Sequence, residues 1–292
     1  MTAVVPRTRR MPLAQRVPLL LSRIAWYLLC ALLAVSMLLP LVWMLSIALK
    51  SNGDINQIPP SFFPKEFDWS NFVTGPNMID FYRLLLNTAI VTVLSTAGAV
   101  VSSMVVGYGI SRIDFPGRKL WFALISGSLF VPGIVGLIPL QHLYISLGLI
   151  DTWVPLVLPA FFGSPIFVFL ARQYYQSIPR YLDESALIDG AGHWTIFTKI
   201  MLPITKPVSI TIAIMSFQLA WNDYLNPLVY LQTGSKFTLS LGMASFLGDT
   251  AGSQYNYYMA TNLLFMLPPL ALFFLAQRYF MEGIGSLGTI SK

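Results

Sequence analysis

Residues 181–207, YLDESALIDGAGHWTIFTKIMLPITKP, form the most polar long segment between otherwise almost unbroken apolar runs. The segment predicts two short helices separated by a hinge. Gly190 suits the left-handed residue that ends a helix, and a second helix can occupy residues 194–200. Because a polar segment of this length does not belong in lipid, we expect it to meet a partner outside the membrane.

The start of this segment carries helix signals. Ser177 is a candidate N-cap of the first helix, and Pro179 suits its first turn, where no N–H is missed. Tyr181, Glu184 and Ile188 follow at helical spacing and are expected to share one side. The small residues beside them permit another surface to approach closely.

The spacing of several residues in the segment is specific. Glu184-Ser185-Ala186 is followed after three residues by Gly190, and after nine more by residues 200–203, Ile-Met-Leu-Pro. This pattern resembles the cytoplasmic loop of permease subunits of binding-protein-dependent ABC importers, which carry Glu-Ala-Ala, Gly and Ile-x-Leu-Pro at these offsets. Only Ser185 departs from the usual alanine, and serine is nearly as small.

The resemblance implies that the loop is a coupling helix that fits a cleft on a nucleotide-binding subunit. Glu184 would pair with a basic residue of that subunit, and Gly190 would give the turn. The expected coupling residues are Glu184, Ser185, Ala186, Asp189 and Gly190. The alternative is an ordinary amphipathic helix between two membrane spans.

The composition is that of a membrane protein. Of the 292 residues, 55% are hydrophobic and only 10% are charged, whereas about a quarter of a soluble domain is charged. The single cysteine, Cys30, lies in the first apolar run and excludes an intramolecular disulfide. The net charge of +6 can be placed in loops on one side of a membrane, so we expect no nucleic-acid partner.

The apolar runs predict an all-α polytopic membrane protein with six transmembrane helices. The first run is long enough to cross a hydrocarbon core of ~30 Å and is too long for a secretory signal. Prolines predict interruptions of the third, fourth and sixth spans, where broken helices are tolerated if they are buried or line a cavity. The expected spans are residues 24–49, 84–111, 120–150, 152–171, about 207–221, and a last span that ends before Arg278.

The basic residues orient these spans. Fourteen of the 18 lysines and arginines fall in the N-terminal segment, in residues 112–119 and 172–206, and in the C-terminal tail. Because lysine and arginine concentrate on the cytoplasmic side, both termini and the 181–207 segment are predicted to be cytoplasmic. The predicted organisation is a cytoplasmic N-terminal segment (1–23) and a permease domain (24–292) with a coupling loop at 172–206.

Small residues in the second span recur every four residues. Gly98 with Ser102, and Ser103 with Gly107, have the spacing that lets two helices approach closely in lipid. A membrane helix that merely tolerates glycine is the alternative. Residues 50–83, rich in proline, asparagine and phenylalanine, predict an ordered loop outside the membrane.

The sequence lacks the motifs of an enzyme. It has two histidines, no His-Glu-x-x-His pattern and no phosphate-binding GxxxxGK[ST] loop. We therefore expect no cofactor or metal in this chain, and ATP with Mg²⁺ in partner subunits. His142 could relay protons or touch a solute, although a neutral hydrogen-bonded histidine is the simpler interpretation.

A second informative patch follows the fifth span, where Trp221, Asn222, Asp223 and Tyr224 occur in sequence. A carboxylate at the bilayer centre costs about 3 kcal/mol, so Asp223 either marks the outer end of the span or faces a wet cavity. An aromatic belt at the membrane interface is one interpretation. The other is a sugar path, in which aromatic faces cover the apolar side of a pyranose and polar groups bond its hydroxyls.

The patch also resembles the Trp-Asn-[Asp/Glu] segment of permeases of the maltose-type carbohydrate importers. With the RIDFPGRK segment at 112–119, the likeness extends over almost the whole chain after the first span. It implies an importer of a sugar or oligosaccharide in the cytoplasmic membrane of a bacterium or archaeon. The implied partners are a second permease subunit, two ATP-binding subunits and an extracytoplasmic solute-binding protein.

Other functions remain open from the sequence alone. The solute could be another small polar molecule. A self-contained channel or secondary transporter would need ionisable residues in the membrane, and the expected spans offer only His142. An intramembrane enzyme lacks a catalytic set.

Overall fold

The computed structural model describes residues 13–59, 61–248 and 254–288. The predicted N-terminal segment at 1–23 lies mostly outside these residues, as do Arg7, Arg9 and Arg10. The described residues are helical or irregular, with no strand among them. This agrees with the all-α prediction.

The first half of the chain contains two long helices and several short ones. They are α1 (Leu13–Ala48), α2 (Asn52–Ile55), α3 (Asn71–Met78), α4 (Phe81–Arg112), α5 (Arg118–Ser128), the 3₁₀ turn η1 (Gly133–Gly136) and α6 (Leu137–Ser146).

The second half begins with short elements and ends in a long helix. They are α7 (Val154–Val157), η2 (Leu158–Phe162), α8 (Pro165–Ser177), α9 (Tyr181–Ile188), α10 (His193–Thr195), the π-helical turn η3 (Ile196–Met201), α11 (Leu202–Ile204), α12 (Lys206–Trp221), α13 (Leu225–Tyr230), η4 (Gly234–Lys236), α14 (Leu239–Met243), η5 (Ala244–Leu247) and α15 (Tyr255–Gly288).

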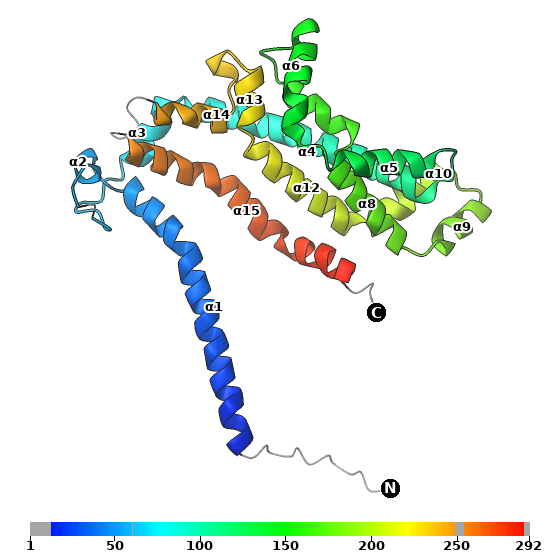
Figure 1. Cartoon of the computed structure of the whole chain (residues 1–292), viewed down its shortest axis with the longest axis horizontal. Coiled ribbons are helices and arrows are strands. Elements are labelled where there is room, and N and C mark those ends of the chain that lie inside the picture. Colours follow the sequence, from blue (N-terminus) through cyan, green and yellow to red (C-terminus); the bar gives the residue numbers. More distant parts are fainter. Residues whose placement is uncertain (1–12, 60, 249–253, 289–292) are drawn as a thin grey trace.

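The helix α4 is the centre of the bundle. It packs against α8 and η2 on one side and against α12 on another, and α15 packs on α12. In Figure 1 these helices all slant from the left of the bundle toward its right. We call the end with α9 to α11 the α9 end, and the end with α3, α13 and α14 the α14 end.

Small residues of α4 allow its close contact with α8 and η2. A Cβ added at Gly107 would lie 2.7 Å from the Cβ of Ala171, and one at Gly98 would lie 2.6 Å from the Phe161 ring. The hydroxyl of Ser102 donates to the carbonyl of Ala160 at 2.9 Å. The prediction that this small-residue spacing serves close helix packing is confirmed.

Membrane spans are less regular than the sequence suggested. Among the described residues, four helical segments are long and apolar enough to cross a bilayer: Ser22–Ala48, Phe81–Arg112, Val154–Ser177 and Tyr255–Gln277. Two pairs of helices, bent by 97° at residues 129–132 and by 78° at Thr205, raise the number to six if each pair is one span. The expected third span is therefore a broken helix, in agreement with its prolines.

One expectation was wrong. The predicted interruption of the sixth span is absent, because α15 continues unbroken through Pro268 and Pro269. Between the expected fifth and sixth spans lie the short helices α13 and α14, whose buried side chains pack on the bundle. Leu239 and Met243 are buried with Phe81 and Phe265 at the α14 end.

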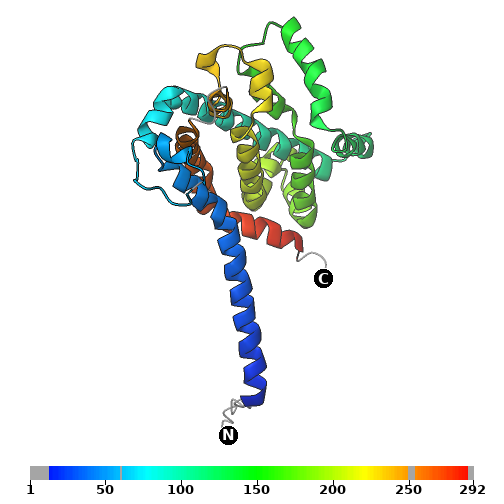
Figure 2. The same ribbon diagram turned by 60° about the vertical axis from the view of Figure 1, so that its left-hand side comes forward.

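The helix α1 contacts the bundle through α15, and most of its length lies outside the bundle. It leaves the α14 end at a large angle to the other long helices (Figures 1 and 2), and its apolar residues from Ser22 to Leu41 are exposed. Its C-terminal end is fixed, because Asn71 donates to the carbonyls of Ala48 and Lys50, each at 2.9 Å. Asn256 of α15 donates to the same Lys50 carbonyl at 3.1 Å.

Candidate functional site

The polar segment after α8 folds as two helical pieces joined at a glycine, as predicted. Gly190 has a φ of +82°, the left-handed conformation that glycine adopts without strain. The amide of Ala191 donates to the carbonyl of Ala186 at 2.9 Å and that of Gly190 to the carbonyl of Leu187 at 3.0 Å. These two bonds form a Schellman motif that ends α9.

The predicted cap of α9 is not formed. Arg180 is the residue that precedes the helix, and no side chain caps its first turn. The Ser177 hydroxyl instead donates to the carbonyl of Tyr174 at 2.7 Å, within the last turn of α8. Pro179 separates the two helices, so Ser177 belongs to the earlier one.

One side of α9 is held against the bundle. Ala186 is buried, and Leu182 packs against the same apolar cluster. Asp183 forms an ion pair of 2.6 Å with Arg112, the last residue of α4. After the glycine turn, Ile196 and Phe197 of the π-helical turn are buried in the cluster too. The segment is therefore anchored on both sides of Gly190.

The other side of α9 is exposed. Tyr181, Glu184 and Ile188 are all exposed, with 86% of Ile188 accessible, which agrees with the prediction that they share one side. Trp194 extends this apolar surface beyond the glycine turn and is 67% exposed. The Glu184 side chain makes no hydrogen bond or ion pair with any described residue. The face thus combines the free carboxylate of Glu184 with large apolar side chains.

Ser185 and Asp189 lie on this exposed part of the chain. The Ser185 hydroxyl donates to the carbonyl of Tyr181 at 2.7 Å, so its polar group is satisfied within the helix and the residue keeps the small profile of alanine. Asp189 is the C-cap residue that precedes Gly190. The five predicted coupling residues therefore lie together, with Ala186 facing inward and the other four exposed.

The second predicted patch follows α12 at the α14 end. Trp221 is buried, its ring stacks with those of Phe217 and Phe265, and its Nε1 donates to the carbonyl of Phe265 at 3.3 Å. Its ring is thus covered on the faces that a sugar would use. In this conformation, Trp221 positions the patch and does not line its surface.

The residues after Trp221 are more accessible. Asn222 and Tyr224 are exposed. Asp223 accepts hydrogen bonds from the amide and side chain of Asn226 at 3.2 and 2.9 Å. Burial raises the pKa of the Asp223 carboxyl, and the bonds from Asn226 oppose that rise. The patch therefore offers an amide, a phenol and a partly buried carboxyl.

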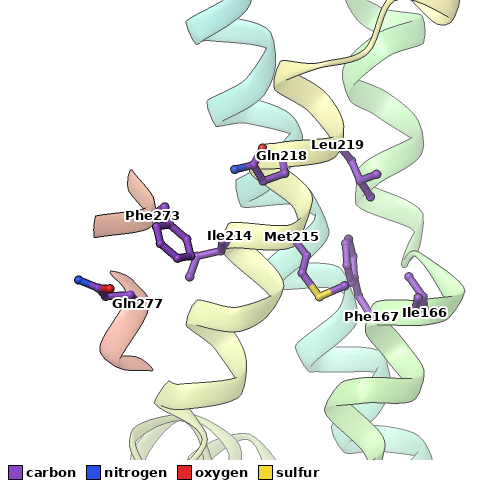
Figure 3. Close-up of a pocket in the computed structure, with 8 residues that line it drawn as sticks. All are labelled: Ile166, Phe167, Ile214, Met215, Gln218, Leu219, Phe273 and Gln277. Carbon is purple, nitrogen blue, oxygen red and sulfur yellow. The ribbon is translucent and has the colours of Figure 1, made fainter. Parts of the chain in front are cut away.

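A groove of about 460 Å³ runs between α8, α12 and α15. Figure 3 shows side chains from all three helices around it, including Phe167, Met215 and Phe273. Its lining is apolar except for the amides of Gln218 and Gln277. Gln218 lies one turn before Asn222, whose Nδ2 approaches the Gln218 Oε1 at 3.2 Å. The groove and the patch are thus joined along one side of α12.

The model of the family described as "Binding-protein-dependent transport system inner membrane component" matches residues 13–285. The chain belongs to this family. As a family member it is a multi-pass protein of the inner membrane and a transport permease.

Curated relatives match this permease over most of its length and of their own. The arabinooligosaccharides transport system permease protein AraQ of Bacillus subtilis (strain 168) is 32% identical over 266 residues, which cover 90% of this chain and 94% of AraQ. The melibiose/raffinose/stachyose import permease protein MelC of the same organism is 31% identical, covering 89% and 94%. The sn-glycerol-3-phosphate transport system permease protein UgpE of Yersinia enterocolitica is 32% identical, covering 78% and 83%.

A solved structure has the same fold. A chain of a bacterial ABC transporter involved in the import of the acidic polysaccharide alginate superposes with a TM-score of 0.79 at 23% identity, covering 94% of this permease and 100% of that chain. A chain of an alginate ABC transporter in complex with an alginate-bound periplasmic protein gives 0.57 at 17% identity, covering 87% and 93%. At these identities the likeness shows the fold.

Three residues of the permease were not identified from the sequence. Arg112 was assigned only to a basic turn, and Asp183 only to the polar segment, although the two pair across 71 positions. Gln218 could have been found from its spacing of four residues from Asn222, which places both on one side of a helix. No local signal indicates the pairing of Arg112 with Asp183.

The structure gives no support for a functional role of His142. His142 is an exposed residue of α6. Among the described residues, no three His, Cys, Asp or Glu side chains lie close enough to hold a metal ion.

Proposed function

We propose that this permease is one of two membrane subunits of an ATP-driven importer that moves a sugar or oligosaccharide into the cytoplasm. Its solute comes from an extracytoplasmic binding protein. Two partner subunits bind ATP with Mg²⁺, and their closure moves α9. The cavity then turns from one side of the membrane to the other.

The observation that carries this proposal is the geometry of α9. The helix exposes Glu184 between apolar side chains, while its opposite side is fixed to α4 through Asp183. A free carboxylate bordered by apolar surface suits a partner cleft with a basic residue. A helix held to the bundle can transmit a displacement, and only a partner state that contacts α9 differently can shift the permease equilibrium.

The proposed topology has six spans with both termini in the cytoplasm. In this topology the bent pair of α5 and α6 counts as one span and α12 as another, with α10 and α11 outside the membrane. The excess of basic residues at 112–119 and 172–206 supports a cytoplasmic α9 end. The membrane is the cytoplasmic membrane of a bacterium or archaeon.

The second permease subunit would cover surface that this chain leaves open. The apolar helix α1 is exposed over most of its length, and the α8–α12–α15 groove is open to the side. Lipid and a second permease together can cover these surfaces. We propose a pair of permease subunits with the solute path between them.

The proposed solute path includes Asn222, Asp223 and Tyr224, with Trp221 holding them in place. Gln218 would continue the polar side of α12 toward the middle of the membrane. Amide, phenol and carboxyl groups suit the hydroxyls of a carbohydrate. The names of AraQ and MelC support an oligosaccharide, and that of UgpE keeps another small polar solute as the alternative.

The test starts with purification of the tagged chain from its native membrane in mild detergent, with mass identification of what accompanies it. We expect an ATPase and a second permease. The purified assembly, reconstituted in liposomes, is then assayed for ATP hydrolysis and uptake of raffinose, an arabino-oligosaccharide and sn-glycerol 3-phosphate in the presence of its binding protein. Recovery of the chain alone after crosslinking, together with transport that survives ATP depletion, would favour a channel or secondary transporter instead.

A further inference from the structure

Arg112 joins three parts of the molecule at the α9 end. It is the last residue of α4, and its side chain is 3% exposed. One terminal nitrogen of its guanidinium donates to the Asp183 carboxylate of α9 at 2.6 Å. The other donates to the carbonyls of Tyr175 and Ile178, where α8 ends. A single side chain therefore links α4, α8 and α9.

The chemistry of this link requires arginine. The last carbonyls of a helix have no donor within the helix, and the guanidinium supplies one to the end of α8. Its donors lie in one rigid plane, so it can bind a carboxylate and two carbonyls at once. Lysine would bring one ammonium at the end of a flexible chain and could not hold the three acceptors in the same way.

A second contact lies one turn earlier on α4. The Tyr108 hydroxyl donates to the carbonyl of His193 at 3.3 Å. The Tyr108 ring packs against those of Tyr175 and Phe197, with centroids 5.7 and 5.2 Å away. The last turns of α4 thus hold the segment both before and after the hinge at Gly190.

The stability of the fold does not by itself explain the presence of this ion pair. Asp183 Oδ1 and Arg112 Nε are buried and have no hydrogen-bond partner among the described residues. A buried pair that is only partly satisfied is often no more stabilising than apolar residues of the same size. The pair does, however, fix the direction of α9 relative to α4.

We propose that Arg112 is a positioning residue for energy coupling, which makes α9 move as one body with α4 through Asp183. This inference rests on the proposed function. When a partner subunit displaces α9, the displacement is transmitted directly to α4, the central helix of the bundle. Without the pair, α9 would move on its own about Gly190, and ATP hydrolysis would proceed with less transport.

The test uses the assembled complex reconstituted in liposomes with its binding protein. The readout is uptake per ATP hydrolysed, for whichever of raffinose, arabino-oligosaccharide or sn-glycerol 3-phosphate the wild-type complex accumulates. Asp183→Asn is the lead variant, because it removes the charge and keeps Arg112 on the two carbonyls. We expect the ratio to fall about fivefold or more, the scale of a typical coupling free energy, at an unchanged amount of assembled complex.

Two further variants separate positioning from folding. Asp183→Glu restores the carboxylate and is expected to recover most of the ratio. Arg118→Gln breaks the ion pair of Arg118 with Asp114, whose two partners both lie in the neighbouring turn and not on α9. It is expected to leave the ratio unchanged.

The outcomes are distinct. A wild-type ratio in Asp183→Asn overturns the proposal, and so does an equal loss in Arg118→Gln. If Asp183→Asn lowers ATP hydrolysis and uptake together through loss of complex, the pair is structural and the proposal is wrong. If the wild-type complex shows no ATP-dependent uptake of any of the three compounds, the proposed function itself fails.

Discussion

The two ends of the bundle are each tied by an ion pair between segments far apart in the sequence, but the pairs differ in kind. At the α9 end, Arg112 and Asp183 are 3% and 15% exposed. At the α14 end, Lys236 and Asp151 are 42% and 21% exposed, at 2.8 Å. The first pair is shielded from water and the second is not.

The two residues of the second pair also make further hydrogen bonds with the same loop. Asp151 accepts from the amides of Gln232 and Thr233, each at 2.9 Å, and Lys236 donates in addition to the carbonyl of Asp151 at 2.7 Å. Loss of one bond leaves others that hold the same loop. Several hydrogen bonds therefore hold the loop at the α14 end, whereas at the α9 end the polar link between α4 and α9 is made by one guanidinium.

The largest expected effect comes from a charge reversal on the exposed face of α9. Glu184→Lys reverses the free charge on the exposed face of α9, so a basic residue of the ATPase would meet a like charge. We expect uptake to be abolished with membrane insertion intact, measured as solute accumulation in cells with the chain quantified in membranes. Glu66→Lys makes the same change on an exposed residue of the loop between α2 and α3, and should leave uptake nearly unchanged. Normal transport by Glu184→Lys would sink the coupling mechanism.

The next prediction compares the two ion pairs directly. Arg112→Ala leaves Asp183 and two carbonyls without their donor, and removing one partner of a buried pair costs about 3–5 kcal/mol. Lys236→Ala removes an exposed partner, where such pairs contribute about 1 kcal/mol or less. We expect thermal unfolding in detergent, followed by tryptophan fluorescence, to shift clearly for Arg112→Ala and little for Lys236→Ala. Equal shifts would show that the ends do not differ.

The packing around glycines also differs between the two ends of the bundle. A Cβ at Gly107 meets the Cβ of Ala171 at 2.7 Å and the backbone nitrogen of Arg172 at 3.2 Å, which belong to a rigid helix. A Cβ at Gly242, at the α14 end, meets the flexible end of the Leu84 side chain. Gly107→Ala should cost about 1–3 kcal/mol, the usual range of overpacking, and Gly242→Ala should cost less.

Gly109→Ala is the matched control for this comparison, because no atom lies within 4 Å of its added Cβ. Unfolding midpoints of the three variants provide the measurement. A Gly107→Ala protein as stable as Gly109→Ala would contradict the close contact of α4 with α8.

The smallest expected effect concerns pH at the α14 end. The hydrogen bonds from Lys236, and then those from Thr233, hold the pKa of Asp151 well below its ordinary value. Asp151 therefore stabilises the folded state fully above the ordinary carboxyl pKa of about 4. This contribution is lost as the pH falls toward the lowered pKa, because the unfolded chain takes up the proton first.

The measurement for this prediction is the difference in unfolding midpoint between the wild type and Asp151→Asn. We expect a constant difference from pH 7 to about 4, the ordinary pKa of an aspartate, and a smaller one below it. A difference that grows on acidification would show that the carboxylate is not held in its charged form.

Much of the fold could be predicted because its signals are local. The long helices were predicted from the apolar runs, and the polar segment from the pattern of residues between Glu184 and Pro203. Gly190 adopts the left-handed conformation expected of it. The four-residue spacing of small residues indicated close packing at Gly107 as one of two alternatives, and its contact with Ala171 supports that alternative. Each of these signals is contained in a short stretch of sequence.

What was missed depends on residues far apart in the chain. The burial of Trp221 comes from Phe265, 44 positions away, and no pattern near Trp221 distinguishes a stacked ring from an exposed one. The pairing of Arg112 with Asp183 is of the same kind. The helices α13 and α14 are too short to show a clear period, and α15 remains continuous despite its two prolines.

The small residues along α4 have a consequence for temperature. Hydrophobic stabilisation in water weakens on cooling, because it is entropic near room temperature. Between helices in lipid that driving force is missing, and close fit and hydrogen bonds such as that of Ser102 take its place. The α4–α8 contact should therefore keep its strength in the cold, and the fluidity of the bilayer, more than the folding of this helix pair, should set the lowest temperature at which the permease works.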